Sequence, residues 1–401
     1  MKKSIMFIAA LGMLVAAASC RKDTVVPVSF TVNVDESALV DVPLPEAYTV
    51  SLTNLSTAEV TTMETENSVA TFSSVVPGLY TVSALASASE NGVSYNFSGT
   101  ASSVEISVEG QEVTIEVTAA ESGSLVFKEI YYACSGDYYI REQFYEVYNN
   151  SDATVYLDGL CIAEVDYYNQ VTKAPYNWQI ENPEKYVFAG DVWQIPGDGT
   201  SYPLEPGESV VIAEWATDHS MESLNPGSAI GDLSSADFEA ITIETTVGTT
   251  VITDNAAINM EHPVMAYSLP QWLTSIGGAT MVIFYPEYEL NSENMIAAEG
   301  LYGGAREIPV EWILDGVNAV SDETMIQYKG LPDNIDAGTI WVGEAYCGQS
   351  IARKISETKE DGRIVYMDTN NTTNDFEVMD KPEIRRNGAK IPSWNTWANS
   401  T

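Results

Sequence analysis

The chain has few basic residues. Lysine and arginine together make up 18 of its 401 residues, against 57 aspartates and glutamates, which gives a net charge of −39. Nucleic acids and anionic membrane surfaces repel a chain this acidic, so nucleic acid is excluded as a partner. The acidic residues are dispersed rather than gathered in blocks, so they indicate solubility at a crowded surface more than a site that attracts cations.

Groups suited to catalysis are also scarce. The two histidines, His219 and His262, each follow a carboxylate, and such a pair can orient a general base. Neighbouring residues in a strand point to opposite faces, however, so adjacency alone makes no catalytic pair. The sequence lacks a G-x-S-x-G elbow, an H-E-x-x-H motif and a phosphate-binding G-x-x-x-x-G-K motif. We predict that the protein is not an enzyme; the alternative is a hydrolase whose paired carboxylates meet only in space.

Only four cysteines occur, at positions 20, 134, 161 and 347. None of them forms a C-x-x-C motif, which excludes a zinc ribbon and a thioredoxin-type redox site. Beyond Cys20, three cysteines allow one disulfide and leave one thiol, and the sequence cannot choose the pair. We take Cys134 with Cys161 as the candidate disulfide for an exported chain.

No apolar run reaches the length of about eighteen residues that a membrane-spanning helix needs. The N-terminus instead combines two lysines, an apolar run over 5–18 and small residues before Cys20. This order is typical of a signal peptide, here 1–19, and predicts export from the cytoplasm.

The small residues that precede Cys20 resemble a lipobox, in which the cysteine is diacylated before cleavage. Ala17 departs from the pattern, because Leu or Val is usual at that position. The resemblance implies a lipid on Cys20 followed by a tether over 20–27. The alternative is ordinary cleavage after Ala18, which would leave Cys20 as a thiol.

Polar and apolar residues alternate in the segments 29–34 and 48–53, which is typical of half-buried strands. Pro77-Gly78 predicts a turn that opens another strand. Strands spaced about 10 to 15 residues apart predict a β-sandwich over 28–120. The stretch 70–86, ATFSSVVPGLYTVSALA, resembles the transthyretin-like, carboxypeptidase-regulatory type of repeat. That resemblance implies a stalk or spacer beside the anchor.

The pattern changes at Gly123, where further strands and a Pro-Gly turn follow. Four segments in order resemble the lamin tail domain, an immunoglobulin-like β-sandwich: 128–130, 145–149, 155–160 and 204–211. The resemblance implies such a sandwich over 123–385, with a C-terminal tail over 386–401. The departures are Leu160 in place of Trp and a long insertion at about 216–330. We therefore expect an all-β protein of two consecutive sandwiches with one or two short helices, one of them near 233–241.

The chain from Cys20 to the segment 368–376, DTNNTTNDF, resembles an uncharacterised family of Bacteroidetes lipoproteins, a domain of unknown function about 400 residues long. The resemblance implies a lipid-anchored protein of the Gram-negative outer membrane, often encoded beside TonB-dependent receptors, and brings no catalytic residues. Few acidic residues follow Cys20, so the signal for the cell surface is weak, although we favour the surface over the periplasmic face.

The same polar segment could hold a metal. Hard cations prefer oxygen ligands, which its side chains supply: Asp368, Asn370, Asn371, Asn374, Asp375 and the nearby Glu377. The segment lacks the order and the central glycine of an EF-hand loop. The hypothesis is a structural Ca²⁺, with no other cofactor expected; the alternative is a turn stabilised by Asn and Asp side chains.

Aromatic residues are concentrated between 131 and 193. Exposed rings stack on sugars or bind peptide side chains, and those in expected loops are the candidates for such contacts: Tyr138, Tyr139, Tyr167, Tyr168, Tyr176 and Trp178. The alternative is ordinary packing, because tyrosine fits β surfaces well. We expect an outer-membrane binding or accessory protein that serves a TonB-dependent transporter, the alternative being an adhesive surface protein that contacts protein or glycan.

Overall fold

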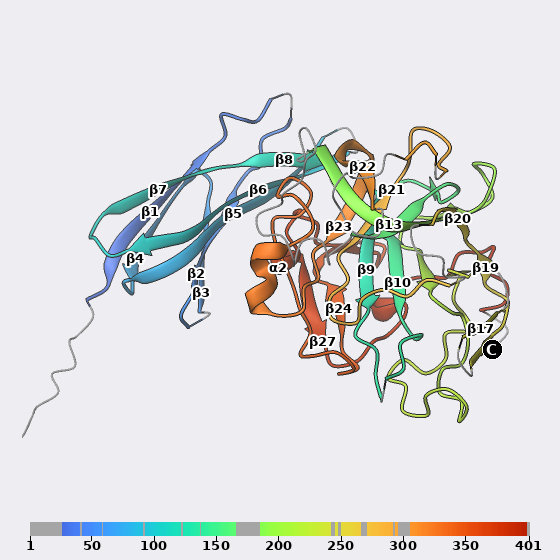
Figure 1. Ribbon diagram of the computed structural model, residues 1–401. Helices are drawn as coiled ribbons and strands as arrows, with labels where there is room; N and C mark the ends of the chain where they lie inside the picture. The colour runs from blue at the N-terminus through green and yellow to red at the C-terminus, as the bar shows by residue number, and fades with distance from the viewer. Residues whose placement is uncertain are drawn as a thin grey trace, which may run out of the picture. The chain divides into compact units, whose positions relative to one another are not determined.

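The computed structural model describes residues 26–40, 42–57, 59–90, 93–121, 123–136, 138–165, 185–241, 245–247, 250–265, 271–291, 293–295 and 305–398. The regular structure is almost entirely β, which confirms the predicted all-β sandwich fold (Figure 1). The helices in these ranges are short: η3 (Val310–Trp312), η4 (Glu323–Tyr328), α2 (Thr372–Asp375) and η5 (Arg386–Gly388). No helix among the described residues is long and apolar enough to cross a bilayer.

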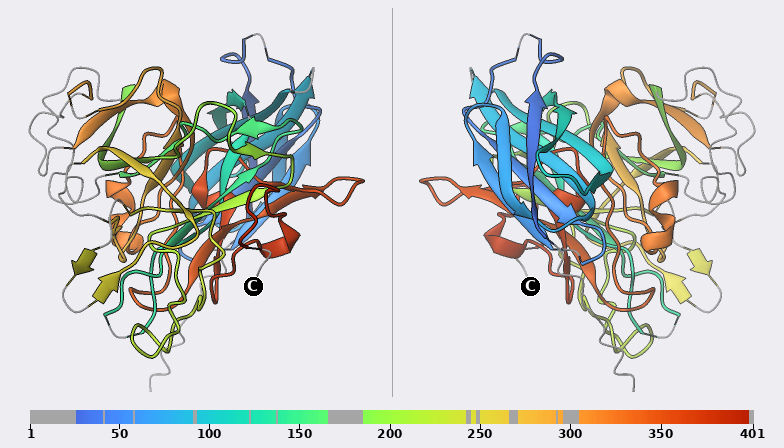
Figure 2. Two further views of the ribbon diagram at one scale, coloured as in Figure 1. Left: turned by 90° about the vertical axis from the view of Figure 1, so that its right-hand side faces the viewer. Right: turned by 90° about the vertical axis from the view of Figure 1, so that its left-hand side faces the viewer.

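The chain divides into two compact units. Unit 1 comprises Met1–Glu36, Ala47–Ala84 and Gly99–Glu116, and unit 2 comprises Ser37–Glu46, Leu85–Ser98 and Val117–Thr401. The first eight strands are β1 (Val28–Asp35), β2 (Tyr48–Asn54), β3 (Val60–Thr65), β4 (Val69–Val75), β5 (Gly78–Glu90), β6 (Val93–Ile106), β7 (Gln111–Glu116) and β8 (Thr118–Glu121). They form a sheet ordered β4-β1-β7 and another ordered β3-β2-β5-β6-β8. Figure 2 shows these strands in blue and cyan from two further sides.

The strand β1 lies in the middle of its sheet. It pairs with β4 in the antiparallel sense, with Val28 opposite Val75, and with β7 in the parallel sense, with Phe30 opposite Gln111 (Figure 1). Burial alternates along β1, so that Phe30 and Val32 are fully buried while their neighbours are half-buried. The strand segment that alternation predicted at 29–34 is therefore present, with its apolar face in the core.

Unit 2 contains two large sheets. One is ordered β19-β16-β15-β10-β9-β24-β27, and the other β20-β13-β12-β21-β23, with β22 also pairing with β13. The strands of the first sheet are β9 (Leu125–Tyr131), β10 (Phe144–Asn149), β15 (Ser209–Ala213), β16 (Phe238–Glu239), β19 (Ile258–Asn259), β24 (Ser350–Arg353) and β27 (Phe376–Met379). Those of the second are β12 (Cys161–Val165), β13 (Tyr186–Gln194), β20 (Glu261–Val264), β21 (Met281–Phe284), β22 (Arg306–Pro309) and β23 (Ile313–Val317).

Three two-stranded pairs accompany these sheets. They join β11 (Val155–Tyr156) to β14 (Pro203–Leu204), β17 (Thr245–Val247) to β18 (Thr250–Ile252), and β25 (Ile355–Thr358) to β26 (Ile364–Tyr366). In the first pair, β14, which precedes the Pro206-Gly207 turn, lies beside β11, which follows β10 in the chain. Gly207 in that turn has φ +85°, a conformation that favours glycine.

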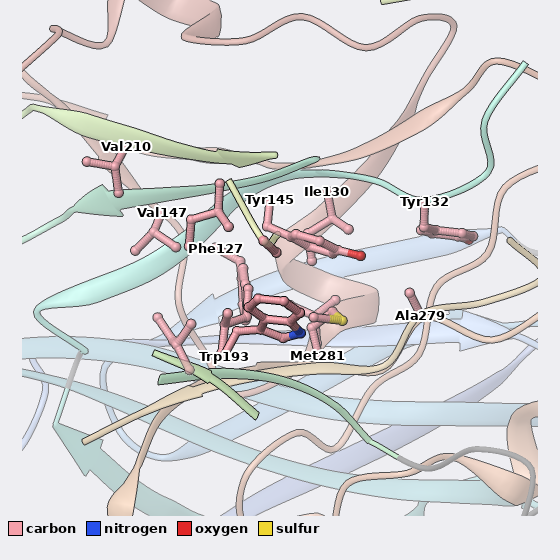
Figure 3. Packing of buried hydrophobic residues seen from close by; sticks show 14 of the residues in the cluster. Phe127, Ile130, Tyr132, Tyr145, Val147, Trp193, Val210, Ala279 and Met281 are labelled. Carbon is pink, nitrogen blue, oxygen red and sulfur yellow. The ribbon is translucent and has the colours of Figure 1, made fainter. Parts of the chain in front are cut away.

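The two sheets of unit 2 bury their core between them. Phe127 and Tyr145 of the first sheet belong to one apolar cluster with Trp193 and Met281 of the second (Figure 3). Every residue of β9, β10 and β15 is buried, including those that face away from this core. Strands covered on both faces have no need to alternate, which explains their continuous apolar runs.

The expected disulfide between Cys134 and Cys161 is wrong. Both residues are free thiols, as is Cys347. Cys161 opens β12 and packs with Ala163 and Trp312 in a second apolar cluster, whereas the alternate residue Ile162 faces the core between the sheets. Cys134 follows β9 in the opposite sheet, so the thiol of Cys161 points away from it.

The helix expected near 233–241 is also absent. The segment forms a turn and then the strand β16, whose Phe238 pairs with Ile212 of β15. The carboxylates on either side of Phe238 accept backbone hydrogen bonds from distant residues: Asp237 from Val211 N at 2.6 Å and Glu239 from Ala216 N at 3.0 Å. These tertiary partners hold the segment extended.

Candidate functional site

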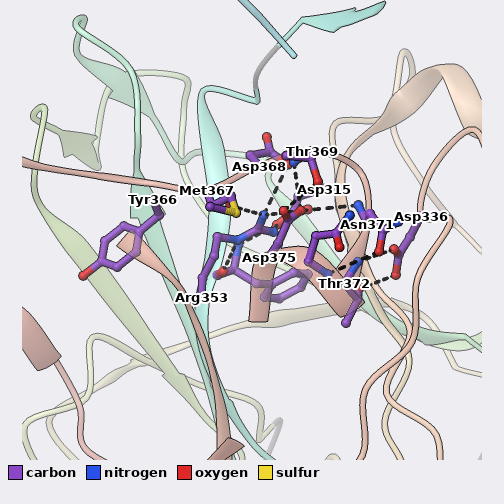
Figure 4. Close-up of polar contacts among 12 residues, drawn as sticks. Asp315, Asp336, Arg353, Tyr366, Met367, Asp368, Thr369, Asn371, Thr372 and Asp375 are labelled. Carbon is purple, nitrogen blue, oxygen red and sulfur yellow. Dashed lines mark hydrogen bonds and ion pairs between the residues drawn. The ribbon is translucent and has the colours of Figure 1, made fainter. Parts of the chain in front are cut away.

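A single arginine gathers three carboxylates inside unit 2. The guanidinium of Arg353, at the end of β24, lies 2.5 Å from Asp315 Oδ2, 3.2 Å from Asp368 Oδ1 and 3.6 Å from Asp375 Oδ2 (Figure 4). Its Nε donates to Phe127 O and its Nη1 to Met367 O, each at 2.8 Å. All four charged side chains are buried, so this Arg353 cluster is an internal ion-pair network.

Burial controls the protonation of the Arg353 cluster. Desolvation raises the pKa of Asp315 to about 7 and that of Asp375 to about 6, although the positive charge of Arg353 opposes both shifts. The negative charge of Asp368 adds to both shifts. One guanidinium therefore offsets the desolvation of Asp315 and Asp375 only in part.

The predicted calcium loop ends in this cluster. Asp368 and Asp375 contact Arg353, and Asp375 also accepts hydrogen bonds from the backbone and hydroxyl of Thr369. The three asparagines have other roles: Asn371 caps α2 and its backbone N donates to Asp375 Oδ2 at 3.3 Å, Asn370 adopts a left-handed φ of 51°, and the carbonyl of Asn374 accepts from Lys354 Nζ. Glu377 is exposed on β27.

This arrangement fits the alternative interpretation, a turn stabilised by Asn and Asp side chains. The guanidinium of Arg353 takes the position between the carboxylates that a cation would need. Across the described residues, no group of three or more His, Cys, Asp or Glu has a geometry suited to a metal ion. Calcium binding stays a prediction, and the arrangement of the loop does not favour it.

Asp336 organises the other side of the same loop. Its carboxylate accepts hydrogen bonds from the backbone and hydroxyl of Thr372, from Asn318 N at 2.8 Å and from Gly338 N at 3.0 Å. Burial raises the pKa of Asp336, and these hydrogen bonds oppose the shift. Sequence reasoning missed Asp336, as it missed Asp315 and Arg353, because no local motif surrounds any of the three.

The candidate contact tyrosines have different environments. Tyr138 is exposed, has a left-handed φ of 64° and makes an edge contact with Tyr346, with their ring centroids 5.8 Å apart. The hydroxyl of Tyr139 instead bonds to Nδ1 of His219 at 2.7 Å. The remaining candidates lie outside the described residues: Tyr167, Tyr168, Tyr176 and Trp178. Cys20 lies outside them as well.

The two histidines do not come together. His219 is fully buried, and its Nε2 bonds to Trp215 O at 3.0 Å. Burial lowers the pKa of His219 to about 4, so the ring is neutral at physiological pH. His262 stacks on Trp193, with centroids 4.1 Å apart, and its Nε2 lies 3.5 Å from Asp191 Oδ1. Each imidazole is thus packed among buried side chains.

Unit 2 also carries two adjoining surface hollows. One, of about 130 Å³, is lined by residues that include Tyr148, Asp361, Arg363, Tyr366, Asn387 and Lys390. The other, of about 430 Å³, is lined by Ala352, Arg353, Ile355, Glu377, Met379, Glu383, Arg386 and Asn387. Because Asn387 lines both hollows, we term the pair the Asn387 groove.

The backbone along the Asn387 groove is held in a rare conformation. Arg385 and Asn387 have positive φ angles, 55° and 63°, and so has the neighbouring Gly388. Left-handed backbone at residues other than glycine costs about 1–3 kcal/mol and clusters at functional sites. Ion pairs hold the segment in place, with Arg386 Nε 3.0 Å from Glu129 and Arg385 Nη2 2.7 Å from Asp237.

Comparison with known proteins identifies relatives. The family described as protein of unknown function, DUF4876, matches residues 205–383. The crystal structure of a DUF4876 family protein from Bacteroides thetaiotaomicron is 35% identical to the chain, with a TM-score of 0.63, and the match covers 92% of this chain and 99% of that one. No curated protein matches the chain.

Proposed function

The chain belongs to the DUF4876 family of proteins of unknown function, and from this premise we propose that it is a non-enzymatic binding lipoprotein of the outer membrane. The lipid is attached to Cys20, and the partner is a TonB-dependent transporter or another component of a surface nutrient-uptake complex. The signal-peptide pattern and the lipobox-like segment before Cys20 support the anchor.

The observation that carries the binding role is the Asn387 groove. Its rare backbone conformation and its partly buried ion pairs fix the groove's shape before any partner arrives. A preformed surface binds more tightly because fewer side chains lose freedom on association. The lining combines exposed charges of both signs, such as Lys390 and Glu377, with the apolar side chains of Ile355 and Met379.

The absence of a catalytic role is part of the proposal. The carboxylates of the Arg353 cluster share Arg353 as their ion-pair partner inside the sandwich. Burial keeps His219 neutral. A general acid or base must reach its substrate. These groups have the interactions of a structural interior.

The test is co-purification from the outer membranes of cells that produce both this protein and a TonB-dependent transporter. We expect the full-length protein, cross-linked on cells, to retain the β-barrel transporter, and Lys390→Glu in the groove to reduce recovery at least fivefold. Lys185→Glu reverses another exposed charge, directly before β13, and should leave recovery unchanged. Equal recovery with all three chains would refute the groove as the binding surface.

A second measurement addresses the anchor and the membrane face. The N-terminal peptide of the mature protein should have the mass of an acylated Cys20. Protease added to intact cells should digest a surface protein, whereas survival until lysis would contradict surface exposure. Strong binding to glycan or matrix material, without recovery of a transporter, would favour the adhesive alternative.

A further inference from the structure

One end of unit 1 presents aliphatic side chains to solvent. Six residues there have exposed fractions between 46% and 71%: Val26, Leu55, Val60, Val76, Leu79 and Val108. They come from the chain before β1 and from the β2–β3, β4–β5 and β6–β7 turns or their borders. We term this set the apolar end of unit 1.

Backbone contacts place these segments at the same end. Val28, at the start of β1, pairs with Val75, the last residue of β4. Gly110 N, in the β6–β7 turn, donates to Ser29 O at 3.0 Å. The β2–β3 turn reaches the start of β5, because Leu55 N donates to Leu79 O at 2.9 Å. The end where the chain enters unit 1 is therefore the apolar end.

The opposite end differs in chemistry. Its β3–β4 turn consists of Glu66, Asn67 and Ser68, and Ser68 O accepts from Val34 N at 2.7 Å. Val69, which follows this turn, is exposed to the same fraction as Leu79, 46%, but its turn neighbours are polar. Within unit 1, exposed aliphatic residues thus gather at the end next to the N-terminal segment, whereas the exposed Val40 and Leu44 lie in the β1–β2 connection, which belongs to unit 2.

The chain length before β1 limits where this end can lie. Val26 is six residues from Cys20, and an extended chain covers about 3.3–3.6 Å per residue, so the reach is about 20 Å. A lipid on Cys20, as in the proposed function on which this inference rests, keeps the apolar end within that distance of the bilayer. We propose that the apolar end of unit 1 inserts its aliphatic side chains into the bilayer interface.

Charge selects the type of lipid surface. No lysine, arginine or histidine occurs between Asp23 and Phe127, so the strands and turns of unit 1 carry no cation to attract anionic headgroups, and the nearest basic residues are Arg21 and Lys22 beside Cys20. Glu109, in the β6–β7 turn, accepts hydrogen bonds from Ser29 N at 2.8 Å and Ser29 Oγ at 2.7 Å. We therefore expect the apolar end to contact zwitterionic lipid through its aliphatic side chains. The acyl chains on Cys20 attach the protein to the bilayer, and this aliphatic contact orients unit 1 on it.

The experiment compares two thiols of equal exposure in the acylated full-length protein. Leu79→Cys and Val69→Cys are each reconstituted in vesicles of phosphatidylcholine and phosphatidylethanolamine, and their reaction with a water-soluble maleimide is followed by peptide mass. We expect the thiol at position 79 to react at least tenfold more slowly than that at position 69. When Cys20→Ser removes the acyl chains, the two thiols should react at similar rates in buffer.

The peptide masses separate this inference from the proposed function. Equal rates in vesicles, with Cys20 acylated, would overturn the insertion and leave the lipoprotein assignment intact. An unmodified Cys20 would overturn the anchor, and the insertion with it. Leu55→Cys provides a second position at the apolar end, and protection at 79 but not at 55 would also contradict insertion of the whole end.

Discussion

Replacing Arg353 by methionine removes the cation from the Arg353 cluster while keeping a side chain of similar length. The substitution leaves three buried carboxylates without their shared partner. It also leaves Phe127 O and Met367 O without a donor from this side chain, and it removes the guanidinium 4.7 Å from the Phe376 ring.

The expected loss is large. Breaking a buried ion pair by removing one partner costs about 3–5 kcal/mol, because the remaining charge stays desolvated. For a unit of about 300 residues, such as unit 2, about 4 kcal/mol corresponds to a fall in Tm of about 6 °C. Lys359→Met, which breaks an exposed ion pair with Glu357, is the matched control and should cost at most about 0.5 kcal/mol.

The loss should depend on pH. The folded pKa values of Asp315 and Asp375, about 7 and about 6, lie above their ordinary 3.8, so the folded state binds more protons than the unfolded state between these values. Stability contributed by these groups therefore falls as pH rises from about 4 to 7. Without Arg353 both pKa values rise further, so Arg353→Met should lose less at pH 5, where both carboxyls are neutral, than at pH 8.

Urea unfolding of both variants at pH 5 and pH 8, followed by tryptophan fluorescence, measures these free energies. Adding Asp315→Asn to Arg353→Met should recover part of the loss, because it removes one unpaired charge. A loss below about 1 kcal/mol, or an equal loss at the two pH values, would refute the assignment of Arg353 as the stabilising cation.

Three further predictions concern the same interior. Excess chelator should leave the Tm of the wild-type protein unchanged, since Arg353 occupies the space between the loop carboxylates; a fall reversed by added calcium would establish the metal site instead. Gly338→Ala should destabilise by about 2 kcal/mol in urea titrations, because its Cβ would lie 2.7 Å from Thr372 N, whereas Gly227→Ala, whose Cβ would have its nearest neighbour at 3.6 Å, should be close to neutral. The imidazole of His219 should titrate near pH 4 by NMR, and because its folded pKa is below the ordinary 6.5, its contribution, up to about 3 kcal/mol, is lost as pH falls through this range; a midpoint near 6.5 would contradict its burial.

The fold could be predicted from the sequence wherever the pattern is local. Alternation at 29–34 placed Phe30 and Val32 on the buried face of β1, as the structure has them. The Pro-Gly sequence before β5 also marked its start. Both signals depend on residues within a few positions of one another, so neither needed knowledge of the tertiary partners.

The segment 233–241 shows why other predictions failed. Its serines and acidic residues resemble the start of a helix, but Asp237 and Glu239 accept hydrogen bonds from backbone amides more than twenty residues away. Phe238 enters the core between the sheets. The free energy of these distant contacts exceeds a local propensity of a few tenths of a kcal/mol per residue.

The site was predicted only in part for the same reason. Asp368 and Asp375 lie close together in the sequence, and the polar segment around them predicted metal ligands. Their partner Arg353 and the third carboxylate, Asp315, come from β24 and β23. Because the residues of the cluster come from separate strands, no motif in the linear sequence could predict it. Arg353 supplies the positive charge between the carboxylates, so they form ion pairs instead of a cation-binding site.

The central position of β1 has a mechanical consequence. Tension on the N-terminal segment acts along β1, which is hydrogen-bonded to β4 on one side and β7 on the other. A force along the strand loads both ladders in shear, so many hydrogen bonds must break together, whereas a terminal strand peeled from a sheet edge would release them one by one. Forced detachment is governed by the unfolding rate, and this geometry slows it. With the proposed lipid anchor at its N-terminus, the protein would therefore keep unit 1 folded when a bound partner is pulled away from the membrane.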